Sequence, residues 1–274
     1  MNEISSKSLK IPAEFAEELS AELYQSEITL QAGPDSRLYS QRKGGSLGME
    51  QLRMLQVHLT EINSQRPFKR LLVTSATRGE GKTHIATNLA LALASEGHQR
   101  VLLIDADLRN PSVHLAYGVP NTYGFKDWLV SGGSPWKAVR KVKRTELYLM
   151  TGGTAACESI DPSRVADLQT QLEQLSPAFD LILLDGPPVL GTVDTKLLCS
   201  VTDSVLLVIG TGVAPRDLVL EAQESLEGQN VLGVVLNRLD PNQPCFATYY
   251  HYTYARQEPA RNGNKGPLTL TKKA

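Results

Sequence analysis

Cysteine, net charge and long apolar runs are all scarce in this chain of 274 residues. Its three cysteines, Cys157, Cys199 and Cys245, form no C-x-x-C pair and leave one unpaired in any disulfide scheme, which favours a reduced, cytoplasmic setting. A formal net charge of −1 provides no overall basic field to attract nucleic acid or an anionic membrane. The chain has no run of about 18 apolar residues and no apolar signal core near Met1, so we expect a soluble protein that reaches a membrane only through a partner.

A phosphate-binding loop is the most informative feature that is present. Residues 76–83 read A-T-R-G-E-G-K-T, which matches A-x-x-x-x-G-K-T, and they lie between an apolar run and an Ala/Leu-rich stretch. Glycines let successive backbone N–H groups surround a phosphate, Lys82 adds a positive charge for the outer phosphates, and the Thr83 hydroxyl can hold Mg²⁺. The residues predicted to contact the nucleotide from this loop are Thr77, Arg78, Gly79, Glu80, Gly81, Lys82, Thr83 and His84.

Apolar strands alternate with helices from residue 70 to about residue 240. The strands are nearly continuous runs of Leu, Ile and Val, as in strands covered on both faces. The pattern therefore predicts an α/β fold, a P-loop NTPase in which a mostly parallel sheet lies between two helix layers. The predicted strands are 71–75, 101–105, 147–151, 181–185, 205–209 and 231–236, and the predicted helices are 49–62, 82–96, 162–175 and 215–227.

Composition changes at both ends of this pattern. Residues 1–45 are predicted to be a weakly ordered arm, with one possible helix at 13–24, before a nucleotide-binding domain at 46–240. Residues 241–274 are predicted to be a tail, which holds Tyr249, Tyr250, Tyr252 and Tyr254, four of the nine tyrosines. This cluster is either an edge strand or adhesive segment, or a set of hydroxyl nucleophiles that a carboxylate could activate towards a γ-phosphate.

Three carboxylates follow predicted strands. Asp105 and Asp107 come at the end of the second strand, and Asp185 ends the fourth. In a parallel sheet these strand ends face the same crevice as the phosphate-binding loop. Each aspartate alone could equally cap a helix. Together they predict metal binding or catalysis, since Mg²⁺ prefers oxygen ligands and phosphoryl transfer needs little more than a metal, a lysine and one base.

These motifs, in this order, resemble the bacterial tyrosine kinases of capsule and exopolysaccharide synthesis, in their soluble kinase-domain form. The resemblance covers residues 46–254. Besides the phosphate-binding loop and the tyrosine cluster, it rests on N-L-A at 88–90, D-A-D-L-R-N-P at 105–111, D-G-P-P at 185–188, V-D at 193–194 and V-L-G-V-V-L-N-R at 231–238.

The resemblance implies an ATP-dependent autokinase that regulates polysaccharide synthesis and export. Lys82 would bind phosphates and Asp107 would be the catalytic base. The Mg²⁺ ligands would be Thr83, Asp105 and Asp185, and the nucleotide base would lie near Asn237 and Arg238. The phosphoacceptors would be Tyr249, Tyr250, Tyr252 and Tyr254, usually modified by a neighbouring subunit. Implied partners are a transmembrane chain-length regulator that recruits the protein to the inner face of the cell membrane, further copies of the chain, and a tyrosine phosphatase.

The chain departs from the family pattern at two places. Arg78 stands where the family usually has proline. The family's E-x-x-R-x-x-R motif, tied to ring formation, reads Glu50-x-x-Arg53-x-x-Gln56 here. Glu50 and Arg53 are therefore candidate interface residues or simply a solvated helix face, and the loss of a second guanidinium puts an octameric ring in doubt.

Two other functions compete with the kinase. Septum-positioning and partition ATPases look similar, but they carry a second lysine at the position of Thr77 and tend to end in a membrane helix or a basic surface. The second alternative is a scaffold of a polysaccharide assembly complex that binds ATP without transferring phosphate. All the acidic and basic positions are present, which favours the kinase.

Overall fold

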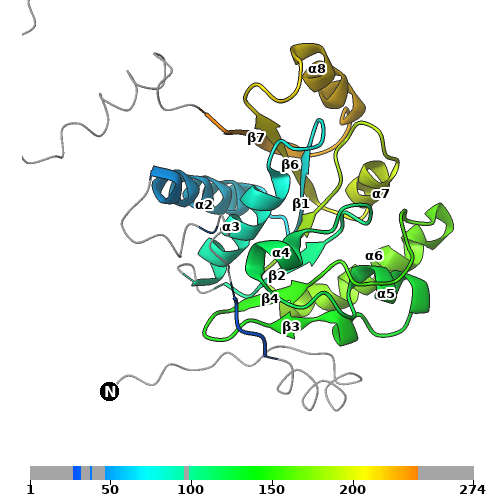
Figure 1. Cartoon of the computed structure of the whole chain (residues 1–274). Coiled ribbons are helices and arrows are strands. Elements are labelled where there is room, and N and C mark those ends of the chain that lie inside the picture. Colours follow the sequence, from blue (N-terminus) through cyan, green and yellow to red (C-terminus); the bar gives the residue numbers. More distant parts are fainter. Residues whose placement is uncertain (1–26, 32–37, 39–46, 96–98, 240–274) are drawn as a thin grey trace, which may run out of the picture. The chain divides into compact units, whose positions relative to one another are not determined.

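The computed structural model describes residues 27–31, 38, 47–95 and 99–239, and they form one sheet with helices on both faces (Figure 1). The strands stand in the order β3-β4-β2-β5-β1-β6-β7. All neighbours pair in parallel except β3 and β4. The strands are β1 (Arg70–Ser75), β2 (Val101–Asp105), β3 (Arg140–Lys141), β4 (Leu147–Met150), β5 (Leu181–Asp185), β6 (Ser204–Gly210) and β7 (Val231–Asn237).

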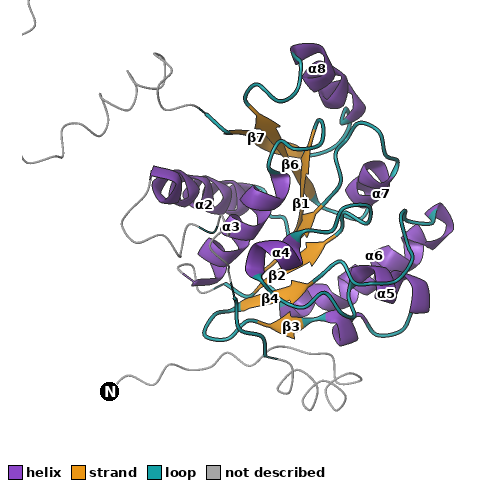
Figure 2. Cartoon of the chain, in the orientation of Figure 1, coloured by secondary structure: helices purple, strands orange, loops and turns teal. Residues whose placement is uncertain are grey.

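The helices divide between the two faces of the sheet (Figure 2). One face is covered by α2 (Leu47–Gln65), α3 (Lys82–Ser95) and α4 (Val113–Tyr117). The other is covered by α5 (Phe125–Ser131), α6 (Val165–Leu175), α7 (Asp194–Ser200) and α8 (Arg216–Ser225). Short 3₁₀ turns lie at Pro135–Ala138, Pro162–Arg164 and Ser176–Ala178.

Alternation along each strand sends successive side chains into two separate cores. On β1, Leu71 packs under α3 whereas Leu72 packs towards α6 and α7. On β2, Leu103 and Ile104 divide in the same way. Because both faces are apolar, the strands read as unbroken apolar runs, and the predicted three-layer α/β/α fold is confirmed.

All six predicted strands and all four predicted helices are present, and each of their ends lies within three residues of the predicted one. Sequence reasoning missed β3, α4, α5 and α7. These elements have two to seven residues each, too short for a periodic signal.

Residues 27–31 and 38 of the predicted arm are described, and several of them contact the core. Leu38 is fully buried, Ile28 forms a parallel bridge with Val142, and Leu30 packs against the same cluster. The possible helix at 13–24 and the tyrosine cluster lie outside the described residues. The chain divides into a unit from Met1 to Asn237 and a second from Arg238 to Ala274.

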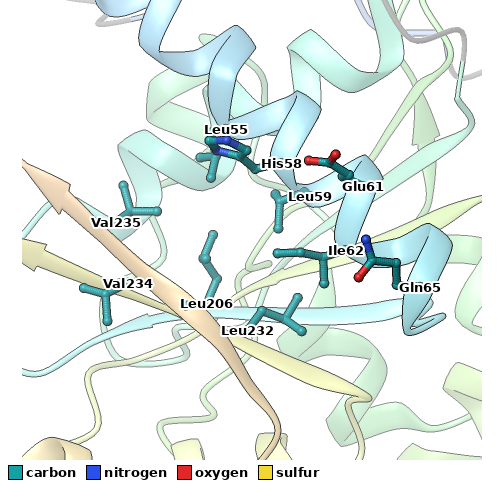
Figure 3. A pocket seen from close by; sticks show the side chains of 11 residues that line it. Leu55, His58, Leu59, Glu61, Ile62, Gln65, Leu206, Leu232, Val234 and Val235 are labelled. Carbon is teal, nitrogen blue, oxygen red and sulfur yellow. The ribbon is translucent and has the colours of Figure 1, made fainter.

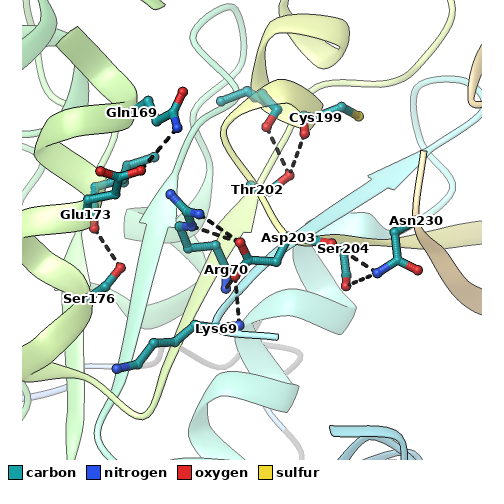
Figure 4. A network of polar contacts seen from close by, with 12 residues as sticks. Lys69, Arg70, Gln169, Glu173, Ser176, Cys199, Thr202, Asp203, Ser204 and Asn230 are labelled. Carbon is teal, nitrogen blue, oxygen red and sulfur yellow. Dashed lines mark hydrogen bonds and ion pairs between the residues drawn. The ribbon is translucent and has the colours of Figure 1, made fainter. Parts of the chain in front are cut away.

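A polar joint ties the starts of β1 and β6 together (Figure 4). Asp203 accepts the backbone N–H groups of Lys69 and Arg70 at 2.8 and 2.7 Å, and the Arg70 guanidinium at 2.7 and 3.2 Å. Asn230 donates to the Asp203 carbonyl and the Ser204 hydroxyl, which adds the start of β7 to the joint.

A hollow of about 400 Å³ lies between α2 and the last two strands (Figure 3). Strand β7 ends the sheet order and is only partly buried. The lining is mostly apolar and consists of Leu55, His58, Leu59, Glu61, Ile62, Gln65, Leu206, Leu232, Gly233, Val234 and Val235. Across the described ranges, no helix is long and apolar enough to cross a membrane.

Candidate functional site

The phosphate-binding loop joins the carboxyl end of β1 to the first turn of α3, at the centre of the sheet. Gly79 and Gly81 have φ angles of 90° and 97°, a region that only glycine adopts at low cost. A Cβ at Gly81 would lie 2.1 Å from the Asn237 side chain. The loop therefore needs glycine at position 81 for both its conformation and its packing.

Glu80 holds the loop in shape from within. Its carboxylate is fully buried and accepts the Thr77 backbone N–H at 2.5 Å, the Thr77 hydroxyl at 3.0 Å and the Gly210 N–H at 2.9 Å. Its carbonyl accepts the Asn237 amide at 2.9 Å. Glu80 was predicted among the nucleotide contacts, and in the structure its carboxylate forms hydrogen bonds with Thr77 of the loop and Gly210 at the end of β6.

Lys82 and Asp107 form a buried ion pair at the carboxyl-terminal edge of the parallel strands. Lys82 Nζ lies 2.7 Å from Asp107 Oδ2, and each residue is less than a tenth exposed. Burial lowers the pKa of the lysine, but the charges of Asp185 and Asp107 outweigh it, so the net pKa is raised. Lys82 therefore remains a fixed positive charge beside the three carboxylates.

Asp105 and Asp185 stand opposite each other on β2 and β5, and both are fully buried. Asp105 Oδ2 accepts the backbone N–H groups of Ser112 and Val113 at 2.8 and 2.9 Å, while its Oδ1 has no partner. Neither Asp185 carboxylate oxygen has a hydrogen-bond partner among the described residues. Burial, and then the charge of Asp185, raises the pKa of Asp105 to about 8.

Burial also raises the pKa of Asp185, against the opposing effects of Lys82 and of the nearby Thr83 hydroxyl. Two buried carboxylates with unpartnered oxygens are costly unless a proton or a cation joins them. The described residues contain no cluster of three or more His, Cys, Asp and Glu side chains that could hold a metal. A cation here would take oxygens from two carboxylates, Thr83 and phosphates, a hard-oxygen set that fits Mg²⁺.

Other predicted contacts lie at the edge of this group or outside it. Arg78 is exposed on the loop. His84 faces Asn88, whose amide donates to the His84 carbonyl at 2.8 Å and lies 3.2 Å from its Nδ1. Arg238 has a positive φ of 59° and begins the second unit. Glu50 and Arg53 are both exposed on α2.

Sequence reasoning missed Ser112 and Gly210, whose groups reach the loop and its carboxylates. Ser112 follows the D-x-D segment within a few residues, so proximity could have suggested it. Gly210 is 130 residues from Glu80, and only the adjacency of β1 and β6 brings them together.

This combination of a glycine loop at a helix start, a buried lysine and strand-end carboxylates defines a P-loop nucleotide-binding protein. Residues 71–247 match the family described as CobQ/CobB/MinD/ParA nucleotide binding domain. The chain is 32% identical to the tyrosine-protein kinase YwqD of Bacillus subtilis over 70% of this chain and 81% of that protein.

Two further proteins resemble this chain, one in sequence and one in structure, and they match different shares of it. The chain is 33% identical to the succinoglycan biosynthesis transport protein ExoP of Rhizobium meliloti over 63% of this chain, but only 22% of that longer protein. The crystal structure of the chimerical protein CapA2B2 superposes with a TM-score of 0.63 and 25% identity, covering 81% of this chain and 98% of that one. The chain belongs to the bacterial tyrosine-protein kinases, a branch of this P-loop family.

Proposed function

We propose that this protein is an ATP-dependent protein-tyrosine autokinase that regulates polysaccharide synthesis and export. The buried Lys82–Asp107 pair carries the proposal, because it places a phosphate-binding cation and a carboxylate base within one hydrogen bond, beside two carboxylates with unpartnered oxygens. The proposed acceptors are Tyr249, Tyr250, Tyr252 and Tyr254.

The residues divide the reaction between them. A tyrosine oxygen attacks the γ-phosphorus, the bond from that phosphorus to the β–γ bridging oxygen breaks, and ADP leaves. Asp107 takes the phenolic proton, and Lys82 stabilises the charge on the transferring group. Asp105, Asp185 and Thr83 would hold Mg²⁺, which when bound neutralises phosphate charge.

Intact mass before and after incubation with Mg-ATP tests the proposal. Wild-type protein should gain increments of about 80 Da per phosphate, and they should vanish when all four tail tyrosines become phenylalanine. Phosphatase treatment should reverse the gain. ATP hydrolysis without any gain of mass, under conditions that activate the enzyme, would favour the switch-type ATPase instead.

Two substitutions separate the proposed roles. Lys82→Met should weaken nucleotide binding and abolish transfer, because the phosphate charge is no longer neutralised. Asp107→Asn should retain nucleotide but lose most phosphorylation, by about 10²-fold or more. An Asp107→Asn rate within a few-fold of wild type would show that the residue only caps the local structure through its bond to the Asn110 N–H.

Membrane recruitment through a transmembrane regulator is also a proposal. Two similar proteins support it by their names, the succinoglycan biosynthesis transport protein ExoP and the chimerical protein CapA2B2. Co-sedimentation of the protein with membranes that contain or lack the candidate regulator tests it, and equal binding to both would reject it. A tyrosine phosphatase that removes the tail phosphates completes the proposed set of partners.

A further inference from the structure

Ser112 occupies the position before α4 but does not cap that helix with its side chain. A serine there normally accepts a backbone N–H from the first turn. Instead its hydroxyl donates across to Thr83 Oγ1 at 3.2 Å, and its backbone N–H donates to Asp105 Oδ2 at 2.8 Å. One residue therefore touches two of the three proposed Mg²⁺ ligands.

The position of Ser112 is fixed by contacts between α4 and α3. The hydroxyl of the fully buried Tyr117 donates to the Thr87 carbonyl at 2.7 Å, and the Thr87 hydroxyl donates to the Thr83 carbonyl at 2.7 Å. These bonds tie α4 to the turn of α3 that carries Thr83. The contact between Ser112 and Thr83 thus follows from helix packing and not from the free rotation of a surface side chain.

The contact with Ser112 leaves one lone pair of the Thr83 hydroxyl oxygen for a cation. A hydroxyl has one hydrogen and two lone pairs. The Ser112 hydroxyl donates to one of the Thr83 lone pairs. The remaining lone pair can face a cation, as can Asp105 Oδ1, because two backbone N–H groups already occupy Asp105 Oδ2.

We propose that Ser112 is a positioning residue that orients the Thr83 hydroxyl and the Asp105 carboxylate towards Mg²⁺. The proposal rests on the proposed nucleotide site and deepens it. Ser112 does not touch the reacting atoms. Its hydroxyl sets how tightly the site holds the metal, and the backbone contact to Asp105 stays when the side chain is changed.

Mg²⁺ titration of nucleotide binding tests this role without measuring kinase activity. The full chain is incubated with a fluorescent ADP analogue, and MgCl₂ is added until binding saturates. In Ser112→Ala the half-saturating Mg²⁺ concentration should rise about 2- to 13-fold, as expected for one lost hydrogen bond. Binding of the analogue in EDTA should stay within about twofold of wild type, because its direct contacts are unchanged.

Three further variants separate positioning from folding. Ser112→Thr keeps the hydroxyl and should restore the wild-type Mg²⁺ dependence. Ser112→Gly lacks it but suits a helix N-terminus, so it should show the same weakened Mg²⁺ response as Ser112→Ala even if alanine disturbs α4. Ser200→Ala removes an exposed hydroxyl bonded only to the Leu197 carbonyl, and it should behave as wild type.

The outcomes are distinct. If wild type shows Mg²⁺-dependent binding and Ser112→Ala and Ser112→Gly match it, Ser112 is a structural residue and the inference is wrong. If wild type itself binds the analogue equally with and without Mg²⁺, the proposed metal site fails, and the inference fails with it.

Discussion

Asp105 is the residue whose chemistry depends most on its surroundings. In the unfolded chain its pKa is 3.8, whereas burial and then the charge of Asp185 raise the pKa to about 8 in the fold. Between these values the folded state holds a proton that the unfolded state has lost. The free energy of unfolding should therefore fall as pH rises from about 4 to about 8.

Denaturant unfolding of the metal-free protein from pH 5.5 to 8.5 checks this prediction. The decline should be reduced in Asp105→Asn, which cannot titrate, and in the presence of Mg-ADP, where a cation replaces the proton. Glu61→Gln, an exposed change on α2, should leave the slope as in wild type. A metal-free protein whose stability is flat over this range would contradict the raised pKa of Asp105.

The Glu80 carboxylate holds the conformation of the phosphate-binding loop through its bonds to Thr77 and Gly210. We therefore expect Glu80→Gln to weaken nucleotide binding, although this side chain does not contact the nucleotide. The glutamine NH₂ group would face the backbone N–H of Gly210 or Thr77, and two donors cannot bond to each other. The unpaired buried donor should lower the free energy of unfolding by about 1–3 kcal/mol. Nucleotide titration and thermal unfolding should both show the loss. If affinity falls while stability is unchanged, the carboxylate contacts nucleotide after all.

At the scale of elements, the joint around Asp203 fixes β1, which carries the phosphate-binding loop, to the start of β6. Asp203→Ala removes the acceptor for two backbone N–H groups and the Arg70 guanidinium. We expect a loss of about 1–3 kcal/mol in unfolding free energy. Glu146→Ala breaks the more exposed pair with Lys141 and should cost about 0.5 kcal/mol or less. Equal losses in the two variants would mean that the joint contributes no more than a surface pair.

Elements differ in how well the sequence predicts them. Strands β1, β2 and β5 are apolar runs with clear ends, because β1 leads into the phosphate-binding loop and β2 and β5 end at Asp105 and Asp185. Helix α4 has five residues, and it forms because Val113 and Tyr117 are buried against α3. Strand β3 has two residues and exists because Arg140 and Lys141 pair with β4. Tertiary contacts create these short elements, so local propensity does not reveal them.

At the scale of the whole molecule, we expect transfer between copies of the chain. The resemblance to the kinase family and the exposure of Glu50 and Arg53 on α2 motivate this prediction. Because Gln56 replaces a second arginine, self-association should be weak, and a membrane partner would raise the local concentration.

A mixing experiment decides between transfer within and between chains. Lys82→Met protein that keeps its tyrosines is combined with a chain that ends at residue 240, and phosphate should appear on the Lys82→Met protein. Omission of the shortened chain is the control. A specific labelling rate of wild type that does not change on dilution would contradict transfer between copies.

The sequence by itself determined the ligand class, the three-layer fold and the residues that end the strands. These properties depend on local patterns: a glycine loop before a lysine, apolar runs of strand length, and carboxylates at their ends. Only the tertiary structure decided what those residues do to one another. It set the 2.7 Å contact of Lys82 with Asp107, the hydrogen bond from the Gly210 N–H to Glu80, and the burial that raises the pKa of Asp105. Distance, burial and charge across the sheet arise from strand order and helix packing, which join residues up to 157 positions apart.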